Sequence, residues 1–308
     1  MKRFKNILVL LGGVSENDPA LLRASALAAS NQARLTLALC LEEFGEEPPT
    51  DDLRKAVVDG LRVRLLAMAD GLRQRGFRAE AEVLFGRAFI QAIVRVLRRQ
   101  HDLVVKTARN HPVQAAVLFG STDLHLLRKC PCPVWMIHPR SGAHRGGVLA
   151  AVDPDPDGAD KRALNTMIMQ LATSLSLLEE TPLHVLHAWH LPAKNTLLDS
   201  PWLKVPRAEV ERLSDEVRRG RQSRFEDLVT PFRPIAPGMQ VHFREGRPES
   251  VIPSVARETD AEVIVMATVG RTGIPGLIIG NTAEAVLNQV DCSVLAIKPA
   301  SFVTPVAA

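Results

Sequence analysis

The chain repeats itself at a spacing of 160 residues. Ala79 to Pro139 superimposes on Met239 to Pro299 without a gap. The identical positions lie at turns and strand edges, and they pair Gly86-Arg87 with Gly246-Arg247, Gly120 with Gly280, Thr122 with Thr282, Cys132 with Cys292 and Pro139 with Pro299. Sparse identities of this kind, with apolar residues matching between them, predict two diverged copies of one fold. Any fold assigned to one half must therefore suit the other half as well.

Both halves alternate short apolar runs with segments of helical periodicity. The first half predicts strands at residues 7–11, 35–41, 81–85, 103–106 and 134–137, with helices between them. The second half predicts strands at residues 148–152 and 183–189, near residue 241, and at residues 263–266 and 294–297. Buried β-branched runs separated by helices are typical of parallel strands that are covered on both faces. The sequence thus predicts two tandem α/β domains, each a doubly wound, mainly parallel five-stranded sheet.

A short polar segment, SGAHRGG at residues 141–147, separates the two copies. It predicts an N-terminal domain at residues 1–140 and a C-terminal domain at residues 147–308. With 308 residues, the chain is long enough for each domain to bury its own core. Because the linker is short, we expect the domains to pack as a pseudo-dimer that buries the closing strands. The sequence leaves open whether the chain also forms a homodimer.

Composition limits the classes of partner. Aromatic residues make up 4% of the chain and Tyr is absent, which argues against a stacking platform for single-stranded nucleic acid. The net charge of +4 is spread along predicted helices, and this favours solvated faces over a nucleic-acid stripe. No segment approaches the roughly 18 apolar residues that cross a bilayer, so no membrane partner is expected. Four cysteines are too few for a disulfide framework and favour a reducing cytoplasm.

A glycine-rich loop in the second copy joins a predicted strand to a predicted helix. Its glycines are Gly270, Gly273, Gly276 and Gly280. Asn281 stands where a helix N-cap is expected, and Glu284 three residues later suggests a capping box. Glycine lets a phosphate approach the backbone, and the unpaired amides of a helix start attract anions. The loop therefore predicts an anion site, with a purely structural turn as the alternative.

The first copy lacks the features that would make the same site. A shift of 141 residues aligns Asp153, which ends the first predicted strand of the second copy, with Gly12. Asn110 and Val113 occupy the loop positions of Gly270 and Gly273. We therefore expect the N-terminal copy to carry a degenerate loop and the C-terminal copy to carry a nearly intact one.

The spacing Ala267-x2-Gly270-x9-Gly280-Asn281-Thr282 resembles the G-x2-G-x9-G-(S/T) signature of the universal stress proteins. The whole chain is similar to the tandem, E-type members of that family, with GRTGI, GNTAE and STDLHLLRKCPCPVW as the closest stretches. The resemblance implies a Rossmann-like fold of the adenine nucleotide alpha hydrolase-like kind in both copies. It also implies that ATP, with or without Mg²⁺, binds at the carboxyl edge of the sheet.

The resemblance assigns the nucleoside end of this site to the strands of the second copy. Asp153 matches the first-strand Asp of the family and would accept hydrogen bonds from the nucleoside. Ala188 and Met266 would pack near the base. Ala267 replaces the first Gly of the family signature, so its Cβ would narrow the cleft. Asp153 also fits a simple turn, because it opens the sequence DPDPDG.

The resemblance assigns the phosphate end to the loop and to the helix start. Gly270 would admit the phosphates and Arg271 would add positive charge. The backbone amides of Gly280, Asn281 and Thr282 would hold the phosphates at the start of the helix. Asn281 replaces the Ser or Thr of the family, a mild change because Asn is also a good N-cap.

Cysteine and histidine patterns suggest two other sites and support neither. Cys130-Pro-Cys132 could be a metal or redox pair, but Cys132 matches Cys292, which has no partner cysteine nearby in the sequence. Small core residues entering a strand are therefore favoured. The histidines at positions 184, 187 and 190 are spaced by three in a predicted strand, so they alternate between faces and do not form a convergent metal set.

No Ser/His/Asp set, Cys/His set or acidic pair can be assembled from the sequence. We expect a cytoplasmic universal stress protein that binds ATP or a related adenine nucleotide in its C-terminal domain. It would act in stress response or regulation without strong catalysis, with slow ATP hydrolysis at most. The alternative is an interaction module, or a protein that binds an apolar ligand through its degenerate N-terminal domain.

Overall fold

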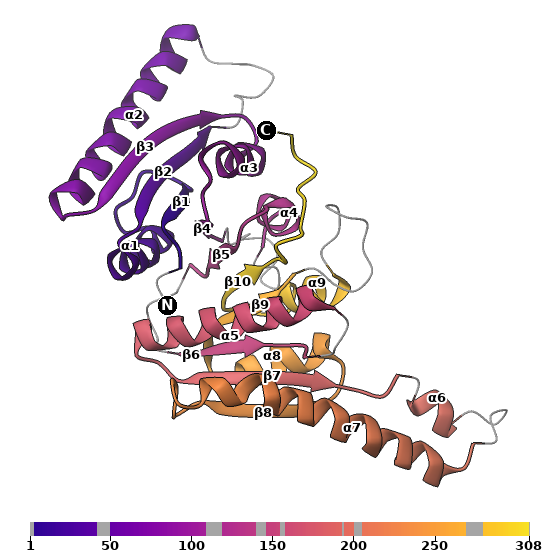
Figure 1. Ribbon diagram of the computed structural model, residues 1–308. Coiled ribbons are helices and arrows are strands. Elements are labelled where there is room, and N and C mark those ends of the chain that lie inside the picture. Colours follow the sequence, from indigo (N-terminus) through magenta and orange to yellow (C-terminus); the bar gives the residue numbers. More distant parts are fainter. Residues whose placement is uncertain are drawn as a thin grey trace.

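The computed structural model describes residues 3–41, 50–108, 119–139, 146–154, 158–192, 194–199, 205–268 and 280–307. Its strands form one ten-stranded sheet in the order β3-β2-β1-β4-β5-β10-β9-β6-β7-β8 (Figure 1). The first copy contributes β1 (Asn6–Leu11), α1 (Pro19–Asn31), β2 (Arg34–Leu41), α2 (Asp51–Gln74), β3 (Arg78–Phe85), α3 (Ala88–Arg99), β4 (Leu103–Thr107), α4 (Ser121–Lys129) and β5 (Val134–Ile137). The second copy contributes β6 (Gly147–Ala151), α5 (Ala159–Glu179), β7 (Leu183–Trp189), α6 (Lys194–Asp199), α7 (Arg207–Val229), the short 3-10 helix Thr230–Phe232, β8 (Gln240–Glu245), α8 (Pro248–Glu258), β9 (Ala261–Ala267), α9 (Asn281–Leu287) and β10 (Ser293–Ile297).

Apolar residues of each strand alternate between two cores, one on each face of the sheet. In β1, Ile7 and Val9 belong to one core, whereas Leu8 and Leu10 belong to the other. Buried residues of α1, α2, α5 and α7 complete the first core, and those of α3, α4, α8 and α9 complete the second. A strand that is buried on both faces has to be apolar at nearly every position, which explains the continuous apolar runs in the sequence. The predicted doubly wound α/β fold is confirmed.

The two copies join through their closing strands. Within each copy neighbouring strands are parallel, but β5 and β10 pair antiparallel, with Val294 opposite Met136 and Ala296 opposite Val134. The closing strands are thus buried by each other, as expected for a pseudo-dimer. The structure adds that the two five-stranded sheets are continuous, because the edge of one hydrogen-bonds to the edge of the other.

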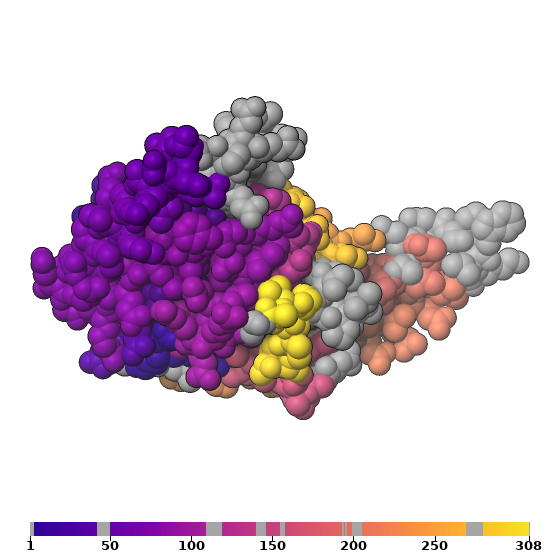
Figure 2. All heavy atoms as spheres, turned by 90° about the horizontal axis from the view of Figure 1, so that it is seen from above, coloured from indigo at the N-terminus to yellow at the C-terminus, as the bar shows by residue number. Residues whose placement is uncertain are grey.

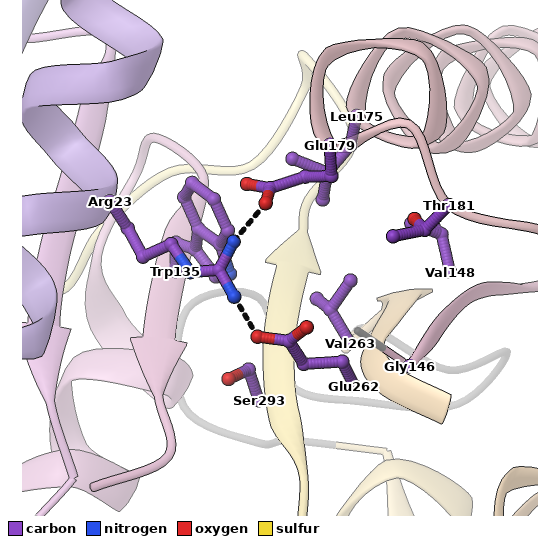
Figure 3. Close-up of a pocket in the computed structure, with 10 residues that line it drawn as sticks. All are labelled: Arg23, Trp135, Gly146, Val148, Leu175, Glu179, Thr181, Glu262, Val263 and Ser293. Carbon is purple, nitrogen blue, oxygen red and sulfur yellow. Dashed lines mark hydrogen bonds and ion pairs between the residues drawn. The ribbon is translucent and has the colours of Figure 1, made fainter. Parts of the chain in front are cut away.

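Charged side chains also connect the copies on both sides of the sheet. Arg23 of α1 forms ion pairs with Glu179 of α5 and Glu262 of β9, at a pocket that Trp135 also lines (Figure 3). On the other face, the Arg128 Nη2 atom of α4 lies 2.7 Å from Glu284 Oε1 of α9. These contacts tie helices of different copies together across the β5–β10 junction.

The segment 191–206, between β7 and α7, contains α6. This helix lies against α7 beyond the end of β7 (Figure 1). Among the described residues, no helix is both long enough and apolar enough to cross a membrane.

Candidate functional site

The strand order reverses once in each copy, and open α/β sheets generally bind ligands at the carboxyl edge beside such a reversal. In the second copy β6 lies between β7 and β9, and in the first copy β1 lies between β2 and β4. Connections leave the sheet in opposite directions from these central strands, so the carboxyl ends of the two diverging strands form a natural ligand crevice. Ala151 of β6 pairs with Met266 of β9 at the end of their parallel register. Asp153 and Ala267 therefore lie at the same edge of the sheet.

Asp153 is held in place by a buried asparagine of α5. Its backbone N–H donates to Asn165 Oδ1 at 2.9 Å, and Asn165 Nδ2 donates to the Asp153 carbonyl at 2.6 Å. The same Nδ2 also donates to the Lys161 carbonyl at 3.1 Å. Asn165 is buried, whereas Asp153 is exposed at the rim of the crevice. The backbone of Asp153 is thus fixed on both sides while its carboxylate stays within reach of solvent.

Asn165 did not stand out in the sequence, although a signal was present. It is a polar residue within an apolar stripe of the predicted helix, and the 141-residue shift aligns it with Ala24. A buried polar side chain needs hydrogen-bond partners. An asparagine where the other copy has an alanine was therefore the available clue.

Ala188 and Met266 lie on the same face of the sheet, in strands that are separated by β6. Met266 and Leu186 belong to the core under α8 and α9, and Ala188 is two residues beyond Leu186 in the same strand. Side chains two residues apart in a strand point to the same face. Ala188 is half-buried. Ala267 packs instead toward the opposite core, so its Cβ and the Met266 side chain lie on different faces.

The end of β9 is joined directly to the start of α9. The Thr268 N–H donates to the Ile297 carbonyl at 3.1 Å, and the Gly280 N–H donates to the Thr268 carbonyl at 2.9 Å. Gly270 and Arg271, to which the resemblance assigns phosphate contacts, lie outside the described residues, in the stretch 269–279. The two ends of this stretch therefore meet at Thr268 and Gly280, beside the carboxyl end of β9.

The N-cap of α9 is Gly280, and the prediction that Asn281 is the N-cap was wrong. The Gly280 carbonyl accepts the first helical hydrogen bond, from the Glu284 N–H at 3.0 Å. Asn281 is the first helical residue and is exposed, and Thr282 follows it half-buried. The backbone hydrogen bond from the Gly280 N–H to the Thr268 carbonyl holds Gly280 at the N-cap, one residue before the predicted N-cap Asn281.

Thr268 is a site residue that the sequence did not single out. It is fully buried, and its hydroxyl has no hydrogen-bond partner among the described residues. An unpaired buried hydroxyl costs about 1–3 kcal/mol. The matching residue of the first copy is Ala108. A hydroxyl at the base of the loop thus distinguishes the second copy from the first.

The corresponding crevice of the first copy is occupied by a buried ion pair. Lys106 Nζ lies 2.6 Å from Asp123 Oδ1 and also donates to the Thr107 carbonyl at 2.9 Å. Asp123 Oδ2 accepts the Gly120 N–H at 3.2 Å. The 160-residue shift aligns Lys106 with Met266 and Asp123 with Ala283. Charged groups in the first copy therefore fill space that carries apolar side chains in the second.

A second polar contact in the first copy joins Thr107, at the end of β4, to Asp18 on the other face of the sheet. The Thr107 hydroxyl donates to Asp18 Oδ1 at 2.6 Å, and the Ala20 N–H donates to the same carboxylate at 2.8 Å. Thr107 matches Ala267 of the second copy. The sequence predicted a degenerate first copy from its loop and from Gly12 in the place of Asp153, and the structure adds these side chains to the difference.

The spacing of three predicted that His184 and His187 lie on opposite faces of the sheet. Their ring nitrogens have different partners. His187 Nδ1 donates to the Val152 carbonyl at 3.1 Å and supports the end of β6. His184 Nδ1 lies 3.1 Å from His242 Nε2 of β8. Burial lowers the pKa of both His184 and His242, and each is lowered further by a neighbour, His242 and Arg244 respectively.

Comparisons with known proteins agree with this architecture. Residues 3–138 and residues 146–298 each match the universal stress protein family. Universal stress protein E of Escherichia coli (strain K12) is 31% identical over 99% of this chain and 98% of its own length. The crystal structure of a functionally unknown protein from Pseudomonas aeruginosa PAO1 has a TM-score of 0.70 and 26% identity, over 97% of this chain and 94% of that one. A universal stress protein from Archaeoglobus fulgidus DSM 4304 shares the fold with a TM-score of 0.60 at 17% identity, over 95% of this chain and 98% of that one. The chain therefore belongs to the universal stress protein family and carries two of its domains in tandem.

Proposed function

We propose that the second copy binds an adenine nucleotide, ATP in the first instance, between the carboxyl ends of β6 and β9. One observation carries this proposal: the two copies have the same strand order, but only the first fills its crevice with the Lys106–Asp123 ion pair. The second copy has Met266 and Ala283 at these positions and so keeps an apolar wall. An apolar wall with a few placed polar groups is the usual form of a small-molecule site.

The nucleoside end would be held by Asp153. A carboxylate only accepts hydrogen bonds, so it suits ribose hydroxyls. The two hydrogen bonds between Asn165 and the Asp153 backbone place this carboxylate before a ligand arrives. Ala188 and Met266 lie on one face of the sheet and would pack near the base, while Ala267 borders the crevice from the other face.

The phosphate end would be held by the backbone amides at the start of α9. Gly280, Asn281 and Thr282 contribute these amides, and Gly270 and Arg271 would contact the phosphates from the loop. The buried Thr268 hydroxyl would gain a partner there, which fits a phosphate oxygen or a bound water. Mg²⁺ would bind chiefly through the phosphates, as this ion usually does.

We infer a regulatory role in the stress response, with slow ATP hydrolysis at most. The proposed contacts bind and orient the nucleotide, and none of them is a nucleophile paired with a base. The four cysteines are free thiols, which fits a reducing cytoplasm. Occupancy of the site would signal by changing the surface around the β9–α9 connection.

Calorimetric titration with ATP in Mg²⁺ buffer tests the site. Gly280→Trp would place an indole at the start of α9, and Gly120→Trp is its matched control at the same position of the first copy. Gly120 has room for a Cβ, since its nearest neighbour would be an Asp123 oxygen at 3.9 Å. We expect Gly280→Trp to weaken binding at least about tenfold, which is about 1.4 kcal/mol, and Gly120→Trp to leave it unchanged. Absence of binding by the wild type, or equal losses in both variants, would contradict the proposal.

A second candidate, an apolar ligand, is favoured by a cavity of about 210 Å³ between the copies. It lies between α1 and α5, not within the first copy as the sequence suggested. Its apolar lining consists of Phe4, Leu27, Trp135, Leu171, Leu175, Leu178 and Leu295. Displacement of a fluorescent fatty acid tests it. Leu175→Trp, which would fill the cavity, should abolish that displacement and leave ATP binding intact.

A further inference from the structure

Two thiols face each other where the first copy meets the second. Cys130 Sγ and Cys132 Sγ lie 3.6 Å apart, and only Pro131 separates the two residues in the chain. Cys130 is the C-cap of α4, and its N–H donates to the Leu126 carbonyl at 2.9 Å. Cys130 is fully buried, whereas Cys132 is half-buried just before β5. The sequence favoured simple core residues here, but this geometry brings the two sulfurs into contact.

The backbone at Cys130 is extended, with φ −67° and ψ 128°. A disulfide needs sulfurs about 2.05 Å apart and Cα atoms about 4.4–6.8 Å apart, a range that residues two apart in an extended chain reach. Pro131 fixes its own φ angle near −65°, so the segment loses little freedom when the ring closes. The sulfurs would need to approach by about 1.5 Å to reach the length of a disulfide bond.

A buried lysine of the second copy provides positive charge beside the thiols. Lys298 Nζ donates to the carbonyls of Leu127 at 2.7 Å and Cys130 at 2.9 Å, at the end of α4. In the described part of the chain no carboxylate lies within ion-pair distance of this ammonium. Burial lowers the pKa of Lys298 to about 8, and the two cysteines oppose that shift. A thiolate at Cys130 is therefore the available counter-charge.

The pKa values of the two thiols are shifted in opposite directions. Burial raises the pKa of the Cys130 thiol, but the hydrogen bond from Cys132 and the charge of Lys298 outweigh it, so that this pKa lies below its ordinary value. The hydrogen bond to Cys130 and burial both raise the pKa of Cys132. The pair therefore favours a Cys130 thiolate that accepts the Cys132 S–H.

The second copy provides an internal comparison. Cys292 matches Cys132, but Val290 stands in the place of Cys130. Burial raises the pKa of Cys292 to about 12, and Asp291 raises it further. A thiol of this kind reacts slowly because the thiolate is the nucleophile. The facing pair of thiols thus occurs at this position in the first copy alone.

We propose that Cys130 and Cys132 form a reversible thiol–disulfide site that a hydroperoxide oxidises. The Cys130 thiolate attacks the peroxide, whose O–O bond breaks to leave a Cys130 sulfenic acid and a hydroxide that takes the Cys132 proton and becomes water. The Cys132 thiolate then attacks the Cys130 sulfur, the S–O bond breaks, and the leaving hydroxide takes a proton from the solvent. Two thiols and one hydrogen peroxide thus become one disulfide and two waters. A thiol reductant reverses the change by exchange.

The site lies beside the C-terminal residues of the chain. The Phe302 ring centroid lies 4.8 Å from Lys298 Nζ, and Val306 packs against the same core as Cys130. The C-terminal end of the chain, in yellow, lies on the surface next to the first copy (Figure 2).

Peptide mass spectrometry of the peroxide-treated full chain tests the proposal. Trypsin releases residues 130–140 as one peptide, so the disulfide makes that peptide lighter by two hydrogens. We expect this change in the wild type and in the matched control Cys292→Ser, and its reversal by dithiothreitol. In Cys130→Ser the change should be lost, and in Cys132→Ser a sulfenic acid at Cys130 should react with dimedone. The proposal would be overturned if both Cys130 and Cys132 could still be alkylated after a peroxide treatment strong enough to oxidise methionines. Disulfides to other chains in place of the Cys130–Cys132 bond would also overturn it.

The pH profile of the oxidation tests the positioning role of Lys298. Lys298→Met should move the rise in oxidation rate to higher pH, because the thiolate loses its neighbouring charge. Lys298→Arg keeps the charge and should restore the profile. An unchanged profile in Lys298→Met, with circular dichroism showing the fold intact, would contradict the role of Lys298.

Discussion

Lys106 Nζ lies 2.6 Å from Asp123 Oδ1, and both side chains are at least nine-tenths buried. The pair occupies the switch-point crevice of the first copy, where the second copy has Met266 and Ala283. Removing one member of a buried ion pair leaves an uncompensated charge, whereas removing both does not. The structural difference between the copies therefore has a measurable energetic signature.

We expect Asp123→Ala to lower the free energy of unfolding by about 3–5 kcal/mol. The double variant Lys106→Met with Asp123→Ala copies the residues of the second domain and should recover most of this loss. Urea unfolding measures both, and Glu211→Ala, which breaks an exposed pair with Arg207, should change the free energy by less than about 1 kcal/mol. A double variant no more stable than Asp123→Ala would show that the ion pair is not what fills this crevice.

Arg23 links the copies through Glu179 and Glu262 (Figure 3). Its side chain is 17% exposed, and the two carboxylates are 23% and 14% exposed. We expect Arg23→Ala to cost about 2–3 kcal/mol, since two partly buried carboxylates lose their partner and solvent screens them only in part. Chemical unfolding should show the loss, and Arg23→Lys should recover part of it. Equal stability of Arg23→Ala and wild type would contradict the role of this contact at the junction.

His101 is 4% exposed, and burial lowers its pKa from the ordinary 6.5 to about 4. The unfolded chain therefore takes up this proton at a higher pH than the folded protein. The contribution of neutral His101 to the free energy of unfolding is fully present above pH 6.5. It is lost as the pH falls through the folded-state pKa of about 4, and the total loss is about 3 kcal/mol. Urea unfolding across this range measures the slope. In His101→Leu the slope should be smaller, and an identical slope in both proteins would refute the assignment.

Asn165 contacts the proposed nucleotide only through the Asp153 backbone. We expect Asn165→Leu to weaken ATP binding about tenfold, equivalent to about 1.4 kcal/mol, because Asp153 is no longer fixed. Thr166→Ala is a suitable control, since its exposed hydroxyl donates to the Arg162 carbonyl on the same helix. Calorimetry on both variants checks this expectation. Unchanged affinity in Asn165→Leu would mean that the position of Asp153 does not matter for binding.

The fold was readable because the signals were repeated. The apolar runs 148–152 and 263–266 of the second half match the runs 7–11 and 103–106 of the first, so each copy supports the strand assignment of the other. The junction was only partly readable. Nothing local in Val134–Ile137 or Ser293–Ile297 specifies an antiparallel partner, because pairing between copies depends on which edges meet.

The candidate site was readable in outline but not in its supporting residues. The positions of Asp153 at a strand end and of Gly280 before a helix were readable, whereas their ligand roles rest on the resemblance and stay predictions. The roles of Asn165, Thr268 and Lys106 were not readable, because each depends on contacts between distant elements or on the depth of burial. The helix start at Gly280 was missed for the same reason, since a hydrogen bond from across the loop decides it.

The number of ATP molecules bound per chain tests the central claim most directly. Equilibrium dialysis of the wild type against labelled ATP in Mg²⁺ buffer should give one nucleotide per chain, because only the second copy keeps its crevice free of the Lys106–Asp123 pair. Two nucleotides per chain, or none at saturating ATP, would contradict the account.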